Sequence, residues 1–352
     1  AVTLLLSLSL VLTASAFQQL PLRRLPSTQR AIDARCRRLV MVNNIERRSV
    51  LSAPLVLPRI VPLIFSEPEN VEAVAQAPVV VLGAGRATGK ECVGALLRRG
   101  MPVRAVARSP VTSKGNDAAF EGADSSLLTQ MYADVTKPET LEPAIKGAKA
   151  VIFAASSSKK GGSPELVDYQ GVVNTAKLCI ANGVERLVIV SSGGVSKPKS
   201  SIYQLLNLFG KIMFWKIKGE DEVRALYAAA STPPSLSYTI VRPGGLTEAA
   251  SVGPAAIELN QGDRWSGRIA RADVAEICVE SIAYKDTQRV TMEAYYSDTR
   301  KPLQEVGLSN ILKLKSSGAD TRGSGKERRG QTWGQLFAGL SADTLIKQQD
   351  SV

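Results

Sequence analysis

Short apolar runs alternate with segments of helical spacing along the chain from residue 79 onward. The runs, three of them rich in valine, stand at residues 79–82, 102–107, 128–133, 150–155 and 186–190, and the third also contains the polar Thr129 and Gln130. A short apolar run of this kind is typical of a strand that is buried on both faces, as in a parallel sheet. Strands that alternate with helices predict parallel strands joined by crossover helices. We therefore expect an α/β fold, a doubly wound parallel sheet in a single domain with a small substrate lobe.

Between the first run and the first helical segment lies a loop with three glycines, in the spacing G-x-G-x-x-x-G. The dehydrogenase fingerprint is G-x-G-x-x-G, so an ordinary strand-to-helix turn is the alternative. Glycines let a backbone turn tightly and approach a pyrophosphate, and free N–H groups at a helix start attract its charge. Because a strand precedes the loop and a helix follows it, we expect a dinucleotide site there. Its contacts would come from Gly83, Gly85, Arg86, Ala87, Thr88 and Gly89.

The residue after the second run bears on the choice of dinucleotide. Arg108 stands there, and no acidic residue lies near it. An NAD site has a carboxylate at this place for the ribose 2′-hydroxyl, whereas a guanidinium suits the 2′-phosphate of NADP. Arg86 would give a second positive contact, and two solvated surface arginines are the alternative. We expect NADP(H) to be preferred over NAD(H).

Small or polar residues also follow the third and fourth runs. Asp134 would stand at the carboxyl edge of the sheet, where its side chain could contact the adenine. The small residues after the fourth run would let the cofactor's ribose lie close to the backbone. The expected contacts at these two strand ends are Asp134, Val135, Ala154, Ala155 and Ser156.

The net charge of +12 is concentrated at the two ends of the chain. Residues 1–50 hold eight arginines against Asp33 and Glu46, and residues 311–352 hold seven basic and four acidic residues. The remaining +3 is spread over the middle, where no basic stripe with interleaved aromatic residues occurs. This distribution argues against nucleic-acid binding.

The chain contains no histidine, which excludes Ser-His-Asp and Cys-His catalysis and any metal site built on imidazole. We expect no metal. The four cysteines are far apart and form no C-x-x-C pair. Cys92, Cys179 and Cys278 lie in predicted helices, so we expect buried free thiols and no disulfide framework.

Taken in order, these segments resemble the atypical short-chain dehydrogenase/reductases, above all the NmrA-like and plastid types. The resemblance covers about residues 78–300 and implies an NAD(P)-binding Rossmann fold. It rests on the glycine loop, Arg108, the residues after the third and fourth runs, Ser191-Ser192, the stretch Tyr238–Leu246, and Arg271–Ala275. The resemblance also implies that Arg242, Pro243 and Gly244 lie beside the nicotinamide end of the cofactor.

The resemblance implies a catalytic serine at Ser191 or Ser192, but the chain departs from the Tyr-x-x-x-Lys pair. Counting back from Lys218 places Phe214 at the tyrosine position. Phenylalanine cannot pass a proton to a substrate oxygen, whereas a phenol beside a lysine can. Tyr203 would substitute if it converged with Lys218 in space, and Lys218 could also bind the nicotinamide ribose. The catalytic candidates are therefore Ser192, Tyr203 and Lys218.

The first 77 residues have the features of a targeting sequence. Residues 1–16 have the apolar core and the Ala14-Ser15-Ala16 site of a signal peptide, and Phe17 opens an arginine-rich, acid-poor region like a transit peptide. This order resembles the bipartite presequence of algae with secondary plastids; secretion is the alternative. Residues 17–77 would be transit peptide and a proline-rich linker, although Arg47-Arg48 also allows a twin-arginine signal. We expect the plastid stroma or thylakoid surface, with the lumen as an alternative, and no transmembrane span in the mature protein.

Residues 301–352 read as a tail with a linker and a short amphipathic helix. In the stretch Trp333–Leu340, apolar residues recur at helical spacing, either for packing on the chain's own domain or for a protein partner. The sequence thus favours an NADP(H)-binding plastid oxidoreductase that acts on an unknown small organic substrate. The alternative is a non-catalytic NADP(H)-sensing or scaffold protein that docks on a plastid protein complex.

Overall fold

The computed structural model describes residues 76–85, 87–109, 124–157, 162–208, 210–230, 235–306 and 325–344. The described residues all belong to one compact unit. The predicted signal and transit peptides lie outside these ranges, as does Arg86. None of the helices in the described part has the length and apolar character that a membrane span requires.

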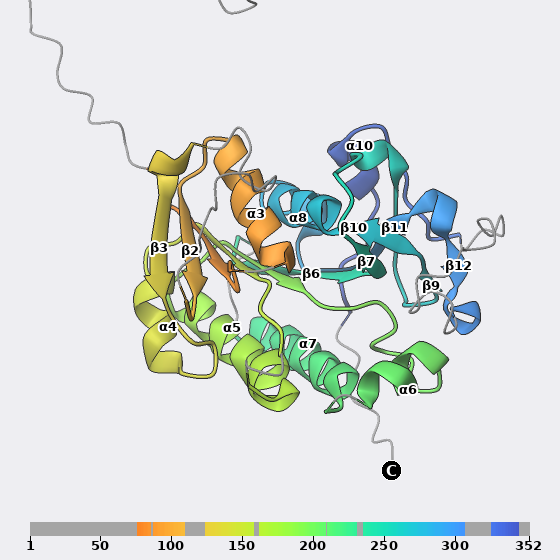
Figure 1. The fold of residues 1–352 in the computed structure, drawn as a ribbon, viewed down its shortest axis with the longest axis horizontal. Coiled ribbons are helices and arrows are strands. Elements are labelled where there is room, and N and C mark those ends of the chain that lie inside the picture. Colours follow the sequence, from red (N-terminus) through yellow and green to blue (C-terminus); the bar gives the residue numbers. More distant parts are fainter. Residues whose placement is uncertain are drawn as a thin grey trace, which may run out of the picture. The chain divides into compact units, whose positions relative to one another are not determined.

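A central sheet of eight strands runs through this unit, with the spatial order β3-β2-β1-β4-β5-β6-β11-β8 (Figure 1). All neighbouring pairs are parallel except β11 and β8, which are antiparallel. The prediction of a doubly wound parallel sheet is confirmed. The strands are β1 (Val79–Leu82), β2 (Val103–Ala107), β3 (Leu128–Tyr132), β4 (Ala150–Phe153), β5 (Arg186–Val190), β6 (Ser237–Pro243), β8 (Ile257–Asn260) and β11 (Val290–Tyr296).

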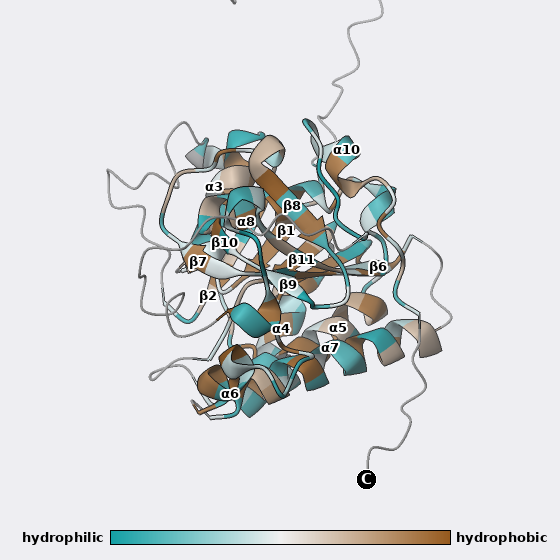
Figure 2. Cartoon of the chain, turned by 90° about the vertical axis from the view of Figure 1, so that its right-hand side faces the viewer, coloured by the Kyte–Doolittle hydropathy of each residue, from teal (hydrophilic) through white to brown (hydrophobic). Residues whose placement is uncertain are grey.

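Helices cover both faces of the sheet (Figures 1 and 2). On one face lie α3 (Ala87–Arg98) and α8 (Arg271–Glu280), joined by the short α10 (Trp333–Phe337). On the other lie α4 (Pro138–Ile145), α5 (Val172–Ala181) and α7 (Ile212–Ala229). A π-helix, η4 (Glu165–Gly171), leads directly into α5, and α6 (Ser201–Asn207) precedes α7.

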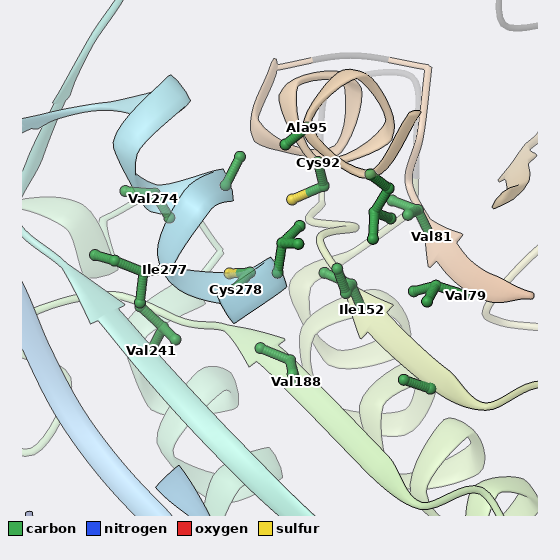
Figure 3. Packing of buried hydrophobic residues seen from close by; sticks show 14 of the residues in the cluster. Val79, Val81, Cys92, Ala95, Ile152, Val188, Val241, Val274, Ile277 and Cys278 are labelled. Carbon is green, nitrogen blue, oxygen red and sulfur yellow. The ribbon is translucent and has the colours of Figure 1, made fainter. Parts of the chain in front are cut away.

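The valine run of β1 shows how the sequence pattern builds this core. Successive side chains of a strand point to opposite faces of the sheet. Val79 and Val81 pack in the cluster beneath α3 and α8, whereas Val80 and Leu82 pack in the cluster beneath α4, α5 and α7. Figure 3 shows the first of these clusters, with the Cys92 side chain of α3 beside α8. The strand is therefore apolar at every position because both of its faces are buried.

The predicted irregular segment 247–268 is more regular than expected. It holds short strands that pair outside the main sheet: β7 (Gly245–Thr247) with β10 (Arg268–Ala270), and β9 (Trp265–Ser266) with β12 (Lys301–Pro302). Strand β8 joins the main sheet from the same segment. Two or three residues per strand are too few for an alternating pattern, so the sequence carried no clear signal for them. The remaining elements are single turns: η3 (Ser125–Leu127), η5 (Pro254–Ala256), η6 (Lys285–Thr287), η7 (Ser297–Thr299) and η8 (Leu303–Glu305).

The C-terminal segment 325–344 packs on the domain, which is one of the two alternatives that the sequence left open for the helix at Trp333–Leu340. Leu336 and Phe337 are completely buried, and the Phe337 ring packs edge-on against Tyr284 at 5.3 Å between centroids. The Asp343 carboxylate accepts a hydrogen bond from the Tyr238 hydroxyl at 3.0 Å. The apolar face considered for a protein partner is therefore used within the chain.

Candidate functional site

The carboxyl ends of β1 and β4 meet at the centre of the sheet, where the strand order reverses. In open α/β sheets, ligands bind in the crevice outside this point because the crossover helices leave it in opposite directions. The glycine loop follows β1 directly and ends where α3 begins. The candidate site is therefore built outward from these two strand ends.

Two glycines of the loop are required by the fold itself. Gly83 has a φ of +85°, and a Cβ there would lie 2.7 Å from the Ala155 Cα that follows β4. A Cβ on Gly89 would overlap the carbonyl oxygen of Gly83. These contacts bring the loop against β4 and the first turn of α3 against the loop. Thr88 is buried in that turn, and the exposed Ala87 before it has a positive φ of 49°.

Gly85 is different, because nothing in the described protein requires a glycine there. It is exposed, its φ is not positive, and a Cβ would meet only the Ala107 Cβ, at an ordinary 3.5 Å. The space that a side chain would fill faces outward at the start of α3. The first amide groups of a helix have no partner within the helix, so this open space lies beside unpaired N–H donors. Such a cradle fits a pyrophosphate group.

Arg108 stands directly after β2 and is exposed. Ala107, the last residue of β2, lies against Gly85, so Arg108 is one residue away from the loop's open side. The structure thus brings Arg108 and the glycine loop together. The predicted second contact, Arg86, is outside the described residues.

The residues after β3 have local structural roles. The Asp134 carboxylate accepts hydrogen bonds from the Thr136 amide at 3.0 Å and the Thr136 hydroxyl at 2.8 Å, which fix the turn into α4. Val135 is buried, and its side chain limits the space at Gly171 in η4. Val135 therefore acts through packing, while Asp134 remains half-buried at the sheet edge.

A buried ion pair, which the sequence did not predict, lies at the end of β4. Ala154 and Ala155 are half-buried there, and the Ser156 hydroxyl donates to Asp168 Oδ1 at 2.8 Å. Lys216 Nζ lies 2.8 Å from the same oxygen, and the Asp168 side chain has no exposed surface. Burial alone would raise the pKa of Asp168, but Lys216 and the hydrogen bond from the Ser157 amide outweigh it and hold the pKa below its usual range.

A glycine in α7 allows this pair to form. Gly219 in α7 lets the helix approach η4, since a Cβ there would lie 2.8 Å from the Asp168 carbonyl oxygen. Lys216 precedes Gly219 by one helical turn and so reaches the Asp168 side chain. The π-helical geometry of η4 turns Asp168 inward; such bulges are frequent at functional sites. A glycine within a helix was the available signal in the sequence.

Lys218, the predicted lysine, points elsewhere. It is exposed, and its Nζ lies 4.5 Å from the centroid of the Tyr169 ring and 5.1 Å from that of Trp215. Tyr203 is buried beside Val195. The condition that Tyr203 and Lys218 converge is therefore not supported, since the two side chains have different neighbours. Burial raises the pKa of the Tyr203 hydroxyl, which keeps it protonated.

The two serines after β5 also have different surroundings. The Ser191 hydroxyl is buried and donates to Glu220 Oε1 at 2.6 Å. The Ser192 hydroxyl is half-buried and donates only weakly, to the Gly193 carbonyl at 3.3 Å. Ser192 is consequently the serine whose hydroxyl can turn toward a ligand.

Arg242 lies beneath the site, where its guanidinium is committed to the protein. Its side chain is 6% exposed, and it forms ion pairs with Glu220 of α7 and, at 3.4 Å, with Glu293 of β11. Burial would raise the pKa of Glu220, but Arg242 and Arg224 hold it at about 2. This differs from the expected side-chain contact between Arg242 and the cofactor: two buried acids attract the guanidinium inward.

A third acid, Asp263, ties this network to the loop after β5. Its carboxylate accepts the Gly194 amide at 2.6 Å and the Ser196 amide at 2.9 Å. Burial raises the pKa of the neighbouring Glu293 to about 8, with Arg242 opposing and Asp263 adding to the rise. The network therefore fixes the position of the segment that carries Ser192.

Pro243 and Gly244 support the site through their backbones. The Gly193 amide donates to the Pro243 carbonyl at 2.9 Å, which joins the ends of β5 and β6. A Cβ on Gly244 would lie 2.5 Å from the Gly267 carbonyl oxygen, so a glycine is required for the approach of the substrate lobe. No cluster of metal-ligating side chains occurs among the described residues.

A family model described as NAD(P)H-binding matches residues 83–285, which is more than half of the chain. The chain belongs to this family. The match begins at Gly83 and includes every strand end described above, so the glycine loop is the start of an NAD(P)H-binding domain. The resemblance to the atypical short-chain dehydrogenase/reductases is confirmed.

Several known proteins are similar to this chain over most of their own length. An uncharacterised chloroplastic protein from Arabidopsis thaliana is 32% identical over 236 residues, which cover 64% of this chain and 79% of the relative. Sanguinarine reductase from Eschscholzia californica is 28% identical over 255 residues, covering 60% of this chain and 85% of that enzyme. Among solved structures, an oxidoreductase from Lactococcus lactis matches with a TM-score of 0.50 and 21% identity, over 68% of this chain and 99% of the other. This last likeness shows the fold alone.

Proposed function

We propose that the chain is an NADP(H)-dependent oxidoreductase of the plastid that acts on a small organic substrate. The observation that carries the proposal is a chain of contacts from the glycine loop, along the end of β4, to Lys216. Gly83 packs against Ala155, the next residue binds Asp168, and Asp168 holds Lys216. The chloroplastic relative and the reductase relative support the location and the reaction class.

The preference for NADP(H) rests on Arg108. It is exposed at the end of β2, one residue from Ala107, which lies against the glycine loop. A guanidinium at this position suits a 2′-phosphate, and the next residue, Ser109, adds no negative charge. The glycine loop would hold the pyrophosphate, and the alanines after β4 would leave room for the ribose.

Bound NADP(H) supplies the hydride, and the chain's own residues would hold the substrate and move the proton. Lys216 lies beside the end of β4, 2.8 Å from Asp168, and helps to hold the pKa of that carboxyl below its usual range. Ser192 has a hydroxyl that can turn toward a substrate oxygen. Phe214 at the usual tyrosine position cannot donate a proton, so the acid would be Ser192, Tyr203 or water.

The second candidate function is NADP(H) binding without catalysis, and Phe214 is the residue that favours it. Phe214 is 42% exposed and packs edge-on against Trp215, so its ring has a place in the fold that needs no phenol. A protein of this kind would bind the cofactor through the same cradle and signal its presence to a partner.

Titration with NADPH and NADH, followed by turnover against a panel of plastid metabolites, separates the two functions. We expect tighter binding of NADPH, loss of that preference in Arg108→Ala, and no change in the control Lys177→Ala on the exposed side of α5. An unchanged preference in Arg108→Ala would refute the NADP(H) assignment. Turnover that falls in Lys216→Met with cofactor still bound would support catalysis. Binding without turnover would refute the oxidoreductase and leave the second candidate.

A further inference from the structure

Large apolar side chains are exposed at one corner of the molecule, formed by η4, α6 and the first turn of α7. Leu166 lies in η4, Leu208 follows α6, and Phe214 lies in α7; they are 42%, 76% and 42% exposed. The Phe214 amide donates to Asn207 Oδ1 at 3.2 Å, which fixes α6 beside the start of α7. We call this surface the α6–α7 corner. Figure 2 shows α6 at the end of the helical layer, away from α10.

The elements of the α6–α7 corner are neighbours, since the start of α7 runs alongside η4 in the same direction. A Cβ on Gly210 would lie 3.1 Å from the Pro164 side chain. One turn further on, the Trp215 ring stacks on Tyr169 with 5.7 Å between centroids. These contacts place η4, which carries the exposed Leu166, beside the turn that enters α7.

Lysines outnumber acidic residues around this corner. Residues 187–219 contain five lysines and no acidic residue. Lys199 and Lys211 are exposed at the two sides of α6, and Lys218 lies over the aromatic pair of the corner. Glu165 is the exposed acid that η4 contributes. The corner thus combines apolar tips with a surplus of ammonium groups.

We infer that the α6–α7 corner docks on the surface of an anionic lipid bilayer. Exposed apolar side chains of a surface helix enter the boundary between headgroups and acyl chains, while lysines beside them bind anionic headgroups. The same two elements, η4 and α7, carry the Asp168–Lys216 pair. If the proposed function holds, docking would therefore place the reaction site next to the membrane, within reach of a lipid-dissolved substrate.

Vesicle sedimentation with the full chain tests the docking without any cofactor. We expect binding to vesicles of phosphatidylcholine mixed with phosphatidylglycerol, weak binding to phosphatidylcholine alone, and release at high salt. The Lys199→Glu and Lys211→Glu changes should each weaken binding by about fivefold or more, from the loss of one favourable charge near the surface. Leu208→Ser should weaken it as well, and because Leu208 is 76% exposed, folding should not change.

Matched controls lie elsewhere on the molecule. Val252→Ser removes another exposed apolar side chain, and Lys146→Glu reverses a charge after α4; neither should affect vesicle binding. Contact through the corner should also bring Trp215 within range of lipids that carry a quencher in their chains. Quenching that persists in Trp215→Phe, or vesicle binding that Leu208→Ser and Lys211→Glu leave unchanged, would overturn the inference. Self-association of the wild type that Leu208→Ser abolishes, with no vesicle binding, would overturn it in favour of a second copy of the chain.

Discussion

Replacing Gly85 by alanine should weaken cofactor binding without weakening the fold. The added Cβ would meet only the Ala107 Cβ, at 3.5 Å, among the described residues. Its methyl group would instead fill the exposed space in front of the first turn of α3, where the pyrophosphate would lie. The neighbouring Gly89→Ala has the opposite geometry, because its Cβ would overlap the Gly83 carbonyl oxygen.

The two substitutions should therefore change the free energy of unfolding in opposite directions. At a position whose φ alanine can adopt, Gly→Ala stabilises a protein by about 0.4–1 kcal/mol, since the unfolded chain loses freedom. For Gly85→Ala we expect this gain, together with at least tenfold weaker NADPH binding, or about 1.4 kcal/mol. For Gly89→Ala we expect destabilisation of about 2 kcal/mol or more, because backbone atoms must move.

Urea unfolding measures the change in stability, and fluorescence titration with NADPH measures the change in affinity. Both experiments use the purified chain. NADPH is the ligand because the chain belongs to an NAD(P)H-binding family. A Gly85→Ala variant that binds NADPH as tightly as the wild type would refute the cradle. A variant that loses both stability and binding would show that Gly85 is required by the fold, contrary to the geometry.

Other substitutions test the buried charges. Lys216→Met should destabilise the protein by about 3 kcal/mol, because Asp168 would remain buried without its cation. Adding Asp168→Asn should restore most of this loss. Urea unfolding of both variants measures the effect, and destabilisation that is additive in the double variant would contradict the reasoning. The raised pKa of Glu293, about 8 against about 4.3 in an unfolded chain, means that the folded state holds an extra proton between these values. Stability should accordingly fall as pH rises toward 8, by up to about 1.4 kcal/mol per pH unit from this group, and Glu293→Gln should flatten that part of a stability-versus-pH curve. Asp343→Asn should weaken the hold on the C-terminal segment by about 1–2 kcal/mol, through its bonds to Arg224 and Tyr238, and faster amide exchange in α10 should report it.

The centre of the main sheet could be predicted because β1 and β4 are apolar at every position. Val79–Leu82 is buried at all four residues, so the sequence had no polar position to confuse with a loop. The short strands of the substrate lobe lacked this property. Strand β9, for example, is two residues long and is held by its partner β12 rather than by a pattern of its own. Propensity over two residues is too weak to compete with tertiary pairing.

Within the site, the sequence predicted backbone roles better than side-chain roles. Gly83, Gly89 and Gly244 stand where a Cβ would collide with neighbouring backbone, and glycine is the residue type that reports such a constraint directly. Arg242 was expected beside the nicotinamide end of the cofactor because the resemblance to the short-chain dehydrogenase/reductases implies it. Its actual partners, Glu220 and Glu293, come from elements far along the chain, and the sequence does not say which strand end they lie beneath.

The helical positions of the buried residues in α7 could have indicated that Lys216, and not Lys218, lies on the buried face. Lys218 was taken as the lysine of the Tyr-x-x-x-Lys pair, and counting back from it placed Phe214 at the tyrosine position. The buried residues of α7, Met213, Glu220 and Tyr227, recur every seven positions, so they mark the face that the helix turns to the sheet. Lys216 lies three residues after Met213 and four before Glu220, so it is on the same face. Lys218 lies outside that face. Lys218→Met is therefore the matched control for Lys216→Met: both remove one lysine from α7, but the Lys218 change leaves the buried Asp168 with its cation.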